Sequence, residues 1–167
     1  MDLGDAKAEL VDGSIQMMAG GSARHAAIAM NIGIALGSRL RGTGCRPFGS
    51  DLAVRTGEAS IRCPDVSVYC RDKSLDDDPT AKLLGDPRLV FEVLSPSTAS
   101  NDQITKLAEY RALPGVQGVV FVDPDNERVR IVVPGADHDG SWLPHGSDLA
   151  LPMLGIVLPH DDIFGDL

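Results

Sequence analysis

The chain has 167 residues, a length that predicts one domain over residues 1–167. Hydrophobic residues make up 43% and charged residues 23%, which is ordinary for a globular protein and argues against a disordered, fibrous or membrane-spanning chain. Aromatic residues are only 4%, so rows of stacking rings for nucleic-acid capture are not expected. The 15 basic and 24 acidic side chains give a net charge of −9, which disfavours tight duplex binding but leaves room for a local basic cleft.

The cysteine pattern and the start of the chain favour a reducing, cytoplasmic setting. Cys45, Cys63 and Cys70 are odd in number and include no C-x-x-C pair, so the sequence predicts neither a closed set of disulfides nor structural zinc. Residues 1–9 carry charges where a signal peptide would be apolar. No run approaches the roughly 20 apolar residues that cross a bilayer, and we therefore expect a soluble protein without a membrane partner.

In chain order, the sequence predicts a hairpin, a helix, three strands, a second helix and further strands. The hairpin covers residues 8–18 around Asp12-Gly13, a dipeptide that supplies the positive φ of a tight turn. Ser22 is placed to cap a helix over residues 23–41. Strands are expected over 46–55, 61–70, 88–94, 116–122 and 128–133, a loop over 71–87, a helix over 101–113, and short strands around 141–143 and 155–158. This order is typical of an α/β protein with a mixed sheet and helices packed on it.

Two of the predicted apolar strands each contain one acidic residue. Alternation places Asp65 on one face of the strand 61–70, and it places Glu92 opposite Phe91 and Val93 in the strand 88–94. A half-buried carboxylate is costly unless it is paired or bound to a cation, and two that converge favour a hard divalent cation. The alternative is that each acid lies solvated at a strand end or is bridged to a nearby arginine such as Arg62 or Arg88.

The second predicted helix has two faces. Ile104, Leu107, Ala108 and Arg111 share one side, which we expect to pack inward. Asp102, Lys106 and Tyr110 lie on the opposite side at intervals of four residues. This polar side is either an ordinary Asp–Lys surface pair or a face that overlooks the two carboxylates.

Three stretches of the chain resemble a known family. They are Pro64-Asp65-Val66, the run Glu92-Val93-Leu94-Ser95-Pro96-Ser97-Thr98, and the series Asp102, Lys106 and Tyr110. They resemble the bacterial "putative restriction endonuclease" family of the Uma-two type, in the PD-(D/E)XK nuclease superfamily. The likeness runs from about Glu9 to the end of the chain. It implies a restriction-endonuclease-like core of helix, three strands, helix and strand, with an N-terminal hairpin and extra C-terminal strands.

The resemblance implies an endonuclease that hydrolyses phosphodiester bonds in DNA with Mg²⁺, for which Mn²⁺ could substitute. Asp65, Glu92 and the carbonyl of Val93 would hold the metal. The superfamily usually places a lysine two residues after the glutamate, a position that is Leu94 here, so the resemblance assigns that role to Lys106. The remaining residues that the resemblance brings to the site are Glu9, His25, Ser95, Asp102 and Tyr110.

Several alternatives stay open at this stage. His25 can act as a base or a phosphate contact, or it can simply cap or pack its helix, and Glu9 can reach the site or not. His138, His145 and His160 lie in turn-rich sequence without ligand spacing and are interpreted as surface residues. The rival functions are a non-catalytic binding protein on a nuclease fold and a metal-dependent hydrolase of a smaller phosphoester. Relatives that cut both strands commonly pair two single-site subunits, so a homodimer is a further expectation.

Overall fold

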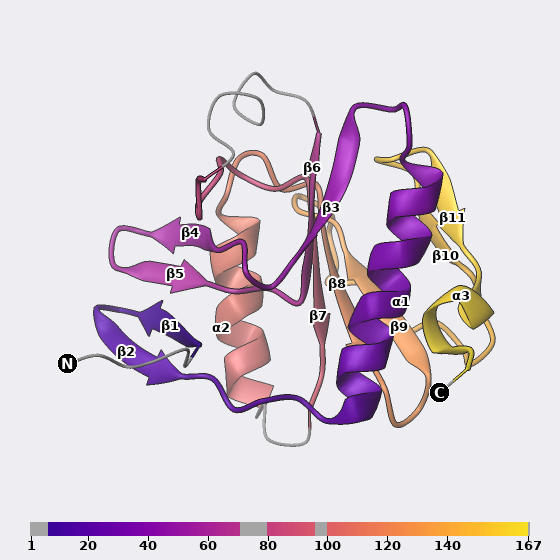
Figure 1. Ribbon diagram of the computed structural model, residues 1–167, viewed down its shortest axis with the longest axis horizontal. Coiled ribbons are helices and arrows are strands. Elements are labelled where there is room, and N and C mark those ends of the chain that lie inside the picture. The colour runs from indigo at the N-terminus through magenta and orange to yellow at the C-terminus, as the bar shows by residue number, and fades with distance from the viewer. Residues whose placement is uncertain (1–6, 71–79, 96–99, 167) are drawn as a thin grey trace.

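The computed structural model describes residues 7–70, 80–95 and 100–166, with the backbone alone described for 100–102 (Figure 1). Residues 71–79 of the loop expected over 71–87 therefore lie outside the described residues. The helices are α1 (Ala23–Arg39), α2 (Ser100–Arg111) and α3 (His160–Phe164). Among the described helices, none is long and apolar enough to span a bilayer.

A five-stranded mixed sheet forms the centre of the fold. Its strands are β3 (Cys45–Gly49), β6 (Val66–Cys70), β7 (Leu89–Val93), β8 (Gly118–Asp123) and β9 (Arg128–Val132), in the order β3-β6-β7-β8-β9. Strands β7 and β8 run parallel, and the other neighbours run antiparallel. A parallel pair needs a crossover, which α2 supplies directly after β7. The mixed α/β fold expected from the sequence is thereby confirmed.

A smaller sheet and a hairpin surround this centre. The smaller sheet has the order β2-β1-β5-β4, from strands β1 (Ala8–Val11), β2 (Ser14–Met17), β4 (Val54–Gly57) and β5 (Ser60–Arg62). The predicted turn between β1 and β2 is present, with φ of 48° at Asp12 and 80° at Gly13. A separate hairpin consists of β10 (Leu149–Leu151) and β11 (Ile156–Leu158).

The central sheet is covered on both faces, as Figure 1 shows for α1 and α2. Leu89, Phe91 and Val93 of β7 pack in the cluster that contains the buried face of α1, the β10–β11 hairpin and α3. Val90 packs in the second cluster, with Leu107 of α2. The alternation predicted for this strand is therefore correct, and it turns Glu92 toward the α2 side.

The two long strands predicted over 46–55 and 61–70 are each divided into two. The first breaks at the turn after Gly49, and the second breaks at Cys63-Pro64, so that their halves enter different sheets. Pro64 cannot donate a ladder hydrogen bond, which accounts for a break at that point. Asp65 consequently lies just before β6 rather than inside a strand, and its side chain stands at the end of the sheet.

The orientation predicted for the second helix is wrong in part. Leu107 is buried as expected, but Ile104 is 67% exposed, whereas Lys106 and Tyr110 are buried. The polar side chains turn inward because they bind carboxylates there, as described below. Residues 141–143, which the structure describes, form no strand, and the sequence analysis missed α3 and β10.

One disulfide is present that the sequence analysis did not predict. Cys45 and Cys70 face each other across β3 and β6 in direct register, and their sulfur atoms are bonded. The sequence pattern missed this pair because 25 residues separate the cysteines and only the sheet brings them together. Cys63 is a free, buried thiol.

Truncation of the α1 core face should destabilise the fold. Leu36 is fully buried, and Leu36→Ala is expected to lower the free energy of unfolding by about 2–5 kcal/mol through lost burial and a residual cavity. The matched control is Ile34→Ala on the same helix, because Ile34 is 63% exposed. Urea unfolding of both variants measures the difference, and equal losses would contradict the assigned face of α1.

Candidate active site

Acidic and basic side chains from five elements meet at one end of the central sheet. Val66 of β6 pairs with Phe91 of β7, so extending this antiparallel register by one residue sets Asp65 beside Glu92. The backbone N–H of Val93 donates to Asp65 Oδ2 at 2.7 Å, which holds that carboxylate at the start of β6. The two strands are neighbours in the sheet, which is the condition under which the two carboxylates can converge.

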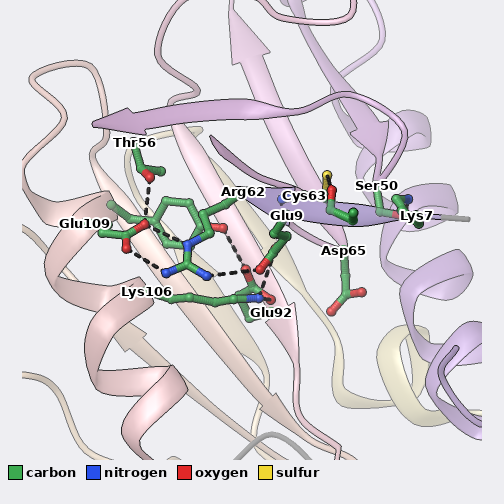
Figure 2. A network of polar contacts seen from close by, with 12 residues as sticks. Lys7, Glu9, Ser50, Thr56, Arg62, Cys63, Asp65, Glu92, Lys106 and Glu109 are labelled. Atoms are coloured by element: carbon green, nitrogen blue, oxygen red, sulfur yellow. Dashed lines mark hydrogen bonds and ion pairs between the residues drawn. The ribbon is translucent and has the colours of Figure 1, made fainter. Parts of the chain in front are cut away.

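Glu92 is buried among hydrogen-bond donors from α2. The hydroxyl of Tyr110 donates to Glu92 Oε1 at 2.7 Å, and Lys106 Nζ lies 3.4 Å from Glu92 Oε2. Lys106 Nζ also lies 3.3 Å from Glu9 Oε1 on β1, so the lysine bridges two glutamates (Figure 2). Of the two alternatives left open for this helix face, the structure has Lys106 and Tyr110 facing the carboxylate, and Glu9 contacts Lys106.

Behind this lysine lies a buried ion-pair network that the sequence analysis did not find. Arg62, which is 1% exposed, donates from Nε and Nη2 to both oxygens of Glu109 at 2.7 and 2.6 Å, and from Nη1 to Glu9 Oε2 at 3.1 Å. Thr56 adds a hydrogen bond to Glu109 at 2.6 Å, and the N–H of Cys63 binds Glu9 Oε1 at 3.0 Å. Figure 2 shows how this network joins α2 to the smaller sheet. The sequence feature that could have indicated this network was Arg62, a charged residue within the predicted apolar strand 61–70.

His25 lies on the other side of Asp65. Its Nε2 is 3.4 Å from Asp65 Oδ2, and Ser22 caps the helix through the His25 N–H as predicted. The hydrogen bond to Asp65 raises the pKa of His25 above its usual 6.5, against the effect of partial burial, and the Val93 backbone raises it further. The His25 imidazole therefore contacts two of the residues expected to hold a metal, and both contacts favour its charged form.

Burial and charge act in opposite directions on the two glutamates of α2 and β7. Burial raises the pKa of Glu92 from 4.5 to about 7; Lys106 opposes this rise, and Asp65 adds to it. Burial would also raise the pKa of Glu109, but hydrogen bonds from Arg62 and Thr56 outweigh it and lower that pKa. Of these two glutamates, Glu92 is therefore the one whose negative charge is less compensated by its neighbours.

An open cavity of about 600 Å³ gives access to the group. Its lining includes His25, Asp65, Glu92, Val93, Ser95 and Lys106. Ser95 was expected at the site and lines this cavity, whereas Glu9 and Tyr110 contact its charged residues from behind. The side chain of Asp102, also expected at the site, lies outside the described residues.

The donor set fits a divalent cation. Four carboxylates, those of Glu9, Asp65, Glu92 and Glu109, surround two permanent cations, Arg62 and Lys106. The excess of negative charge lies at Asp65 and Glu92, which line the cavity and offer the oxygen ligands that Mg²⁺ and Mn²⁺ prefer. A cation held there would also oppose the rise in the pKa of Glu92 that burial and the nearby Asp65 cause.

Comparison with known proteins identifies the family. The model of the Uma2 family, described as "Putative restriction endonuclease", matches residues 2–159. The chain belongs to this family. The resemblance stated from the residues is therefore confirmed over nearly the whole chain.

Similar proteins cover most of the chain. Two uncharacterized proteins of Synechocystis sp. are similar to the chain. One is 33% identical over 96% of this chain and 85% of its own, and the other is 30% identical over 70% and 66%. A crystal structure from Anabaena variabilis, described as a putative nuclease belonging to DUF820, superposes with a TM-score of 0.80 at 20% identity, over 96% of this chain and 91% of that chain. That likeness shows a shared fold.

The buried charge of Glu92 should make stability depend on pH. The pKa of Glu92 is raised from 4.5 to about 7 in the folded state. Between these two pH values the folded protein holds a proton that the unfolded chain has released, so the free energy of unfolding falls as the pH rises from 4.5 to about 7. In metal-free buffer, the stability of the wild type relative to Glu92→Gln should drop by at most about 3 kcal/mol between pH 5 and pH 8. Thermal unfolding across this range measures the drop, and a constant difference would contradict the assignment.

Removal of Arg62 should be severe because it leaves the buried Glu9 and the half-buried Glu109 without their guanidinium partner. Arg62→Ala is expected to cost about 3–5 kcal/mol of stability. The double variant with Glu109→Gln should recover part of this loss, since one of the unpaired charges is then gone. Arg55→Ala on the exposed side of β4 is the matched control, with a small change expected. Similar losses in the two arginine variants would show that the network is not structural.

Proposed function

We propose that the chain is a divalent-metal-dependent endonuclease that hydrolyses phosphodiester bonds in DNA. The observation that supports this most strongly is that Asp65, Glu92 and Lys106, from three elements, line one open cavity. Family membership supports nuclease activity in general. The metal and the DNA substrate are the finer part of the proposal, and they rest on the carboxylate pair and on the resemblance.

Each residue has a distinct part in the proposed reaction. Bound Mg²⁺ would activate a water and polarise the scissile phosphate. Asp65 and Glu92 would hold it, with the Val93 carbonyl as a third ligand. Lys106 would stabilise the negative charge that develops on the phosphate, because its ammonium lies beside Glu92 although it belongs to a different element.

His25 has a supporting part in this proposal. Asp65 raises the pKa of His25 and so favours the charged imidazole, and both His25 and Lys106 line the cavity. When protonated, His25 would add to the positive charge of Lys106 and help to attract a phosphate into a protein whose net charge is −9. Cleavage of both DNA strands would require two copies of the chain, since one copy offers a single carboxylate pair of this kind in its described part.

Metal binding tests the carboxylate pair without any choice of substrate. Titration calorimetry with Mn²⁺ should show one saturable site in the wild type and at least about tenfold weaker binding in Asp65→Asn and in Glu92→Gln. Glu58→Gln, in the exposed turn after β4, is the control and should bind as the wild type does. Binding that is unchanged in both site variants would refute the metal assignment.

Cleavage tests the lysine. Lys106→Ala should retain Mn²⁺ binding within a few-fold and lose about 100-fold or more of the DNA cleavage rate, because charge stabilisation is removed and the metal ligands stay. Lys82→Ala, at an exposed position, should cleave normally. Normal cleavage by Lys106→Ala would exclude the assigned role, and activity that hardly weakens with salt would favour the smaller phosphoester over DNA.

A further inference from the structure

A second cluster of potential metal ligands lies away from the active-site cavity. It consists of Glu127 in the turn between β8 and β9, His145 in the segment before β10, and His160 at the start of α3. One ligand atom from each residue lies within 4.8 Å of the ligand atoms of the other two. None of the three lines the active-site cavity. The sequence interpretation of both histidines as surface residues is correct for His145, which is exposed, but not for His160, whose side chain is largely buried.

Two of the three ligands are already in contact. His145 Nε2 lies 3.0 Å from Glu127 Oε2. The other carboxylate oxygen is held by Arg24 Nη2 at 2.8 Å, and Arg24 Nε donates to the Pro124 carbonyl at 3.1 Å. Arg24 therefore orients the glutamate while Oε2 stays on the histidine side. Hydrogen bonds from His145 and Arg24 also lower the pKa of Glu127, so its carboxylate is charged at neutral pH.

The third ligand offers a nitrogen that nothing else uses. His160 Nδ1 lies 3.2 Å from Asp161 Oδ1, a contact that favours a proton on Nδ1 and leaves the Nε2 lone pair available. Nε2 is buried and has no hydrogen-bond partner among the described residues. The side chain as a whole is 12% exposed, and its ring centroid lies 4.9 Å from those of His145 and Phe164. A histidine held by a carboxylate through one nitrogen is the usual support of a metal ligand.

We propose that Glu127, His145 and His160 bind one Zn²⁺ ion. Two imidazole nitrogens and one carboxylate oxygen are a ligand set that zinc accepts, with water in the fourth position. The hard cations expected at Asp65 and Glu92 prefer oxygen, so this site differs from the active site in metal preference. The ligands come from three separate segments, and the ion would tie the β8–β9 turn to the C-terminal hairpin and α3.

Binding replaces the present contact between His145 and Glu127. The proton between Nε2 and Oε2 moves to Nδ1 of a neutral His145, or to solvent if the ring carries two protons, and both Nε2 and Oε2 then turn a lone pair to the ion. Asp161 and Asp148 stand beside His160 and offset the charge of Arg24 next to the ion. Zinc affinity should therefore fall as pH is lowered and the imidazoles take up protons.

The experiment uses the full chain with Asp65→Asn and Glu92→Gln, because zinc could otherwise bind at those carboxylates. Calorimetry with Zn²⁺ and visible absorption of Co²⁺ should show one equivalent bound with a tetrahedral spectrum. In the same background, His145→Asn, His160→Gln and Glu127→Gln should each weaken binding at least about tenfold. His138→Asn is the matched control and should bind as its parent does, since His138 contacts Gly140 instead.

The outcomes separate the possibilities. No saturable zinc binding, or binding that all three ligand variants retain, would overturn the site. His160→Gln can perturb α3, so its unfolding is followed by circular dichroism; His145 is exposed, and loss of binding in His145→Asn with an unchanged melting temperature supports the site directly. Failure of the nuclease proposal would leave this result untouched, because no readout here depends on cleavage.

Discussion

The buried pairing of Arg62 with Glu109 and Glu9 is the constraint on which the site depends. Arg62 belongs to β5, Glu9 to β1 and Glu109 to α2, so one guanidinium fixes the smaller sheet against the helix that carries Lys106. Its fork geometry matches Glu109 through two parallel hydrogen bonds, which a lysine could not supply. Glu9 is shared between Arg62 and Lys106, and the network thus passes directly into the cavity wall.

This arrangement places an amine beside Glu92 although Leu94 occupies the strand position at which the resemblance implies a lysine. Glu92 points to the α2 side of the sheet, and the crossover helix follows within a few residues of β7. The amine of Lys106 therefore approaches Glu92 from the helix packed on the sheet, and not from a position two residues further along the same strand. It is kept beside the carboxylate by two ion pairs, and the hydroxyl of Tyr110 one turn later closes the group.

Local pattern predicted the strand β7, the facing of Glu92, the hairpin turn at Asp12-Gly13 and the cap at Ser22, because each depends on neighbours in sequence. The orientation of α2 could not be obtained in this way. The hydrophobic pattern places Ile104 on the buried side of the helix. In the structure Lys106 and Tyr110 are buried instead, because both bind buried carboxylates there. The roles of Arg62 and Glu109, the Cys45–Cys70 bond and the meeting of Glu127, His145 and His160 all arise from contacts between distant segments.

Because Lys106 and Glu92 lie on different elements, the distance between them is set by apolar packing. In a Glu-x-Lys strand, the pleat alone holds the two groups on one face. Here Leu107 and Val90 belong to the same core cluster, and they determine how closely α2 approaches β7. A substitution that enlarges or shrinks these apolar side chains would move the ammonium relative to the carboxylate. Substitutions in core residues that do not line the cavity can therefore change the distance between Lys106 and Glu92.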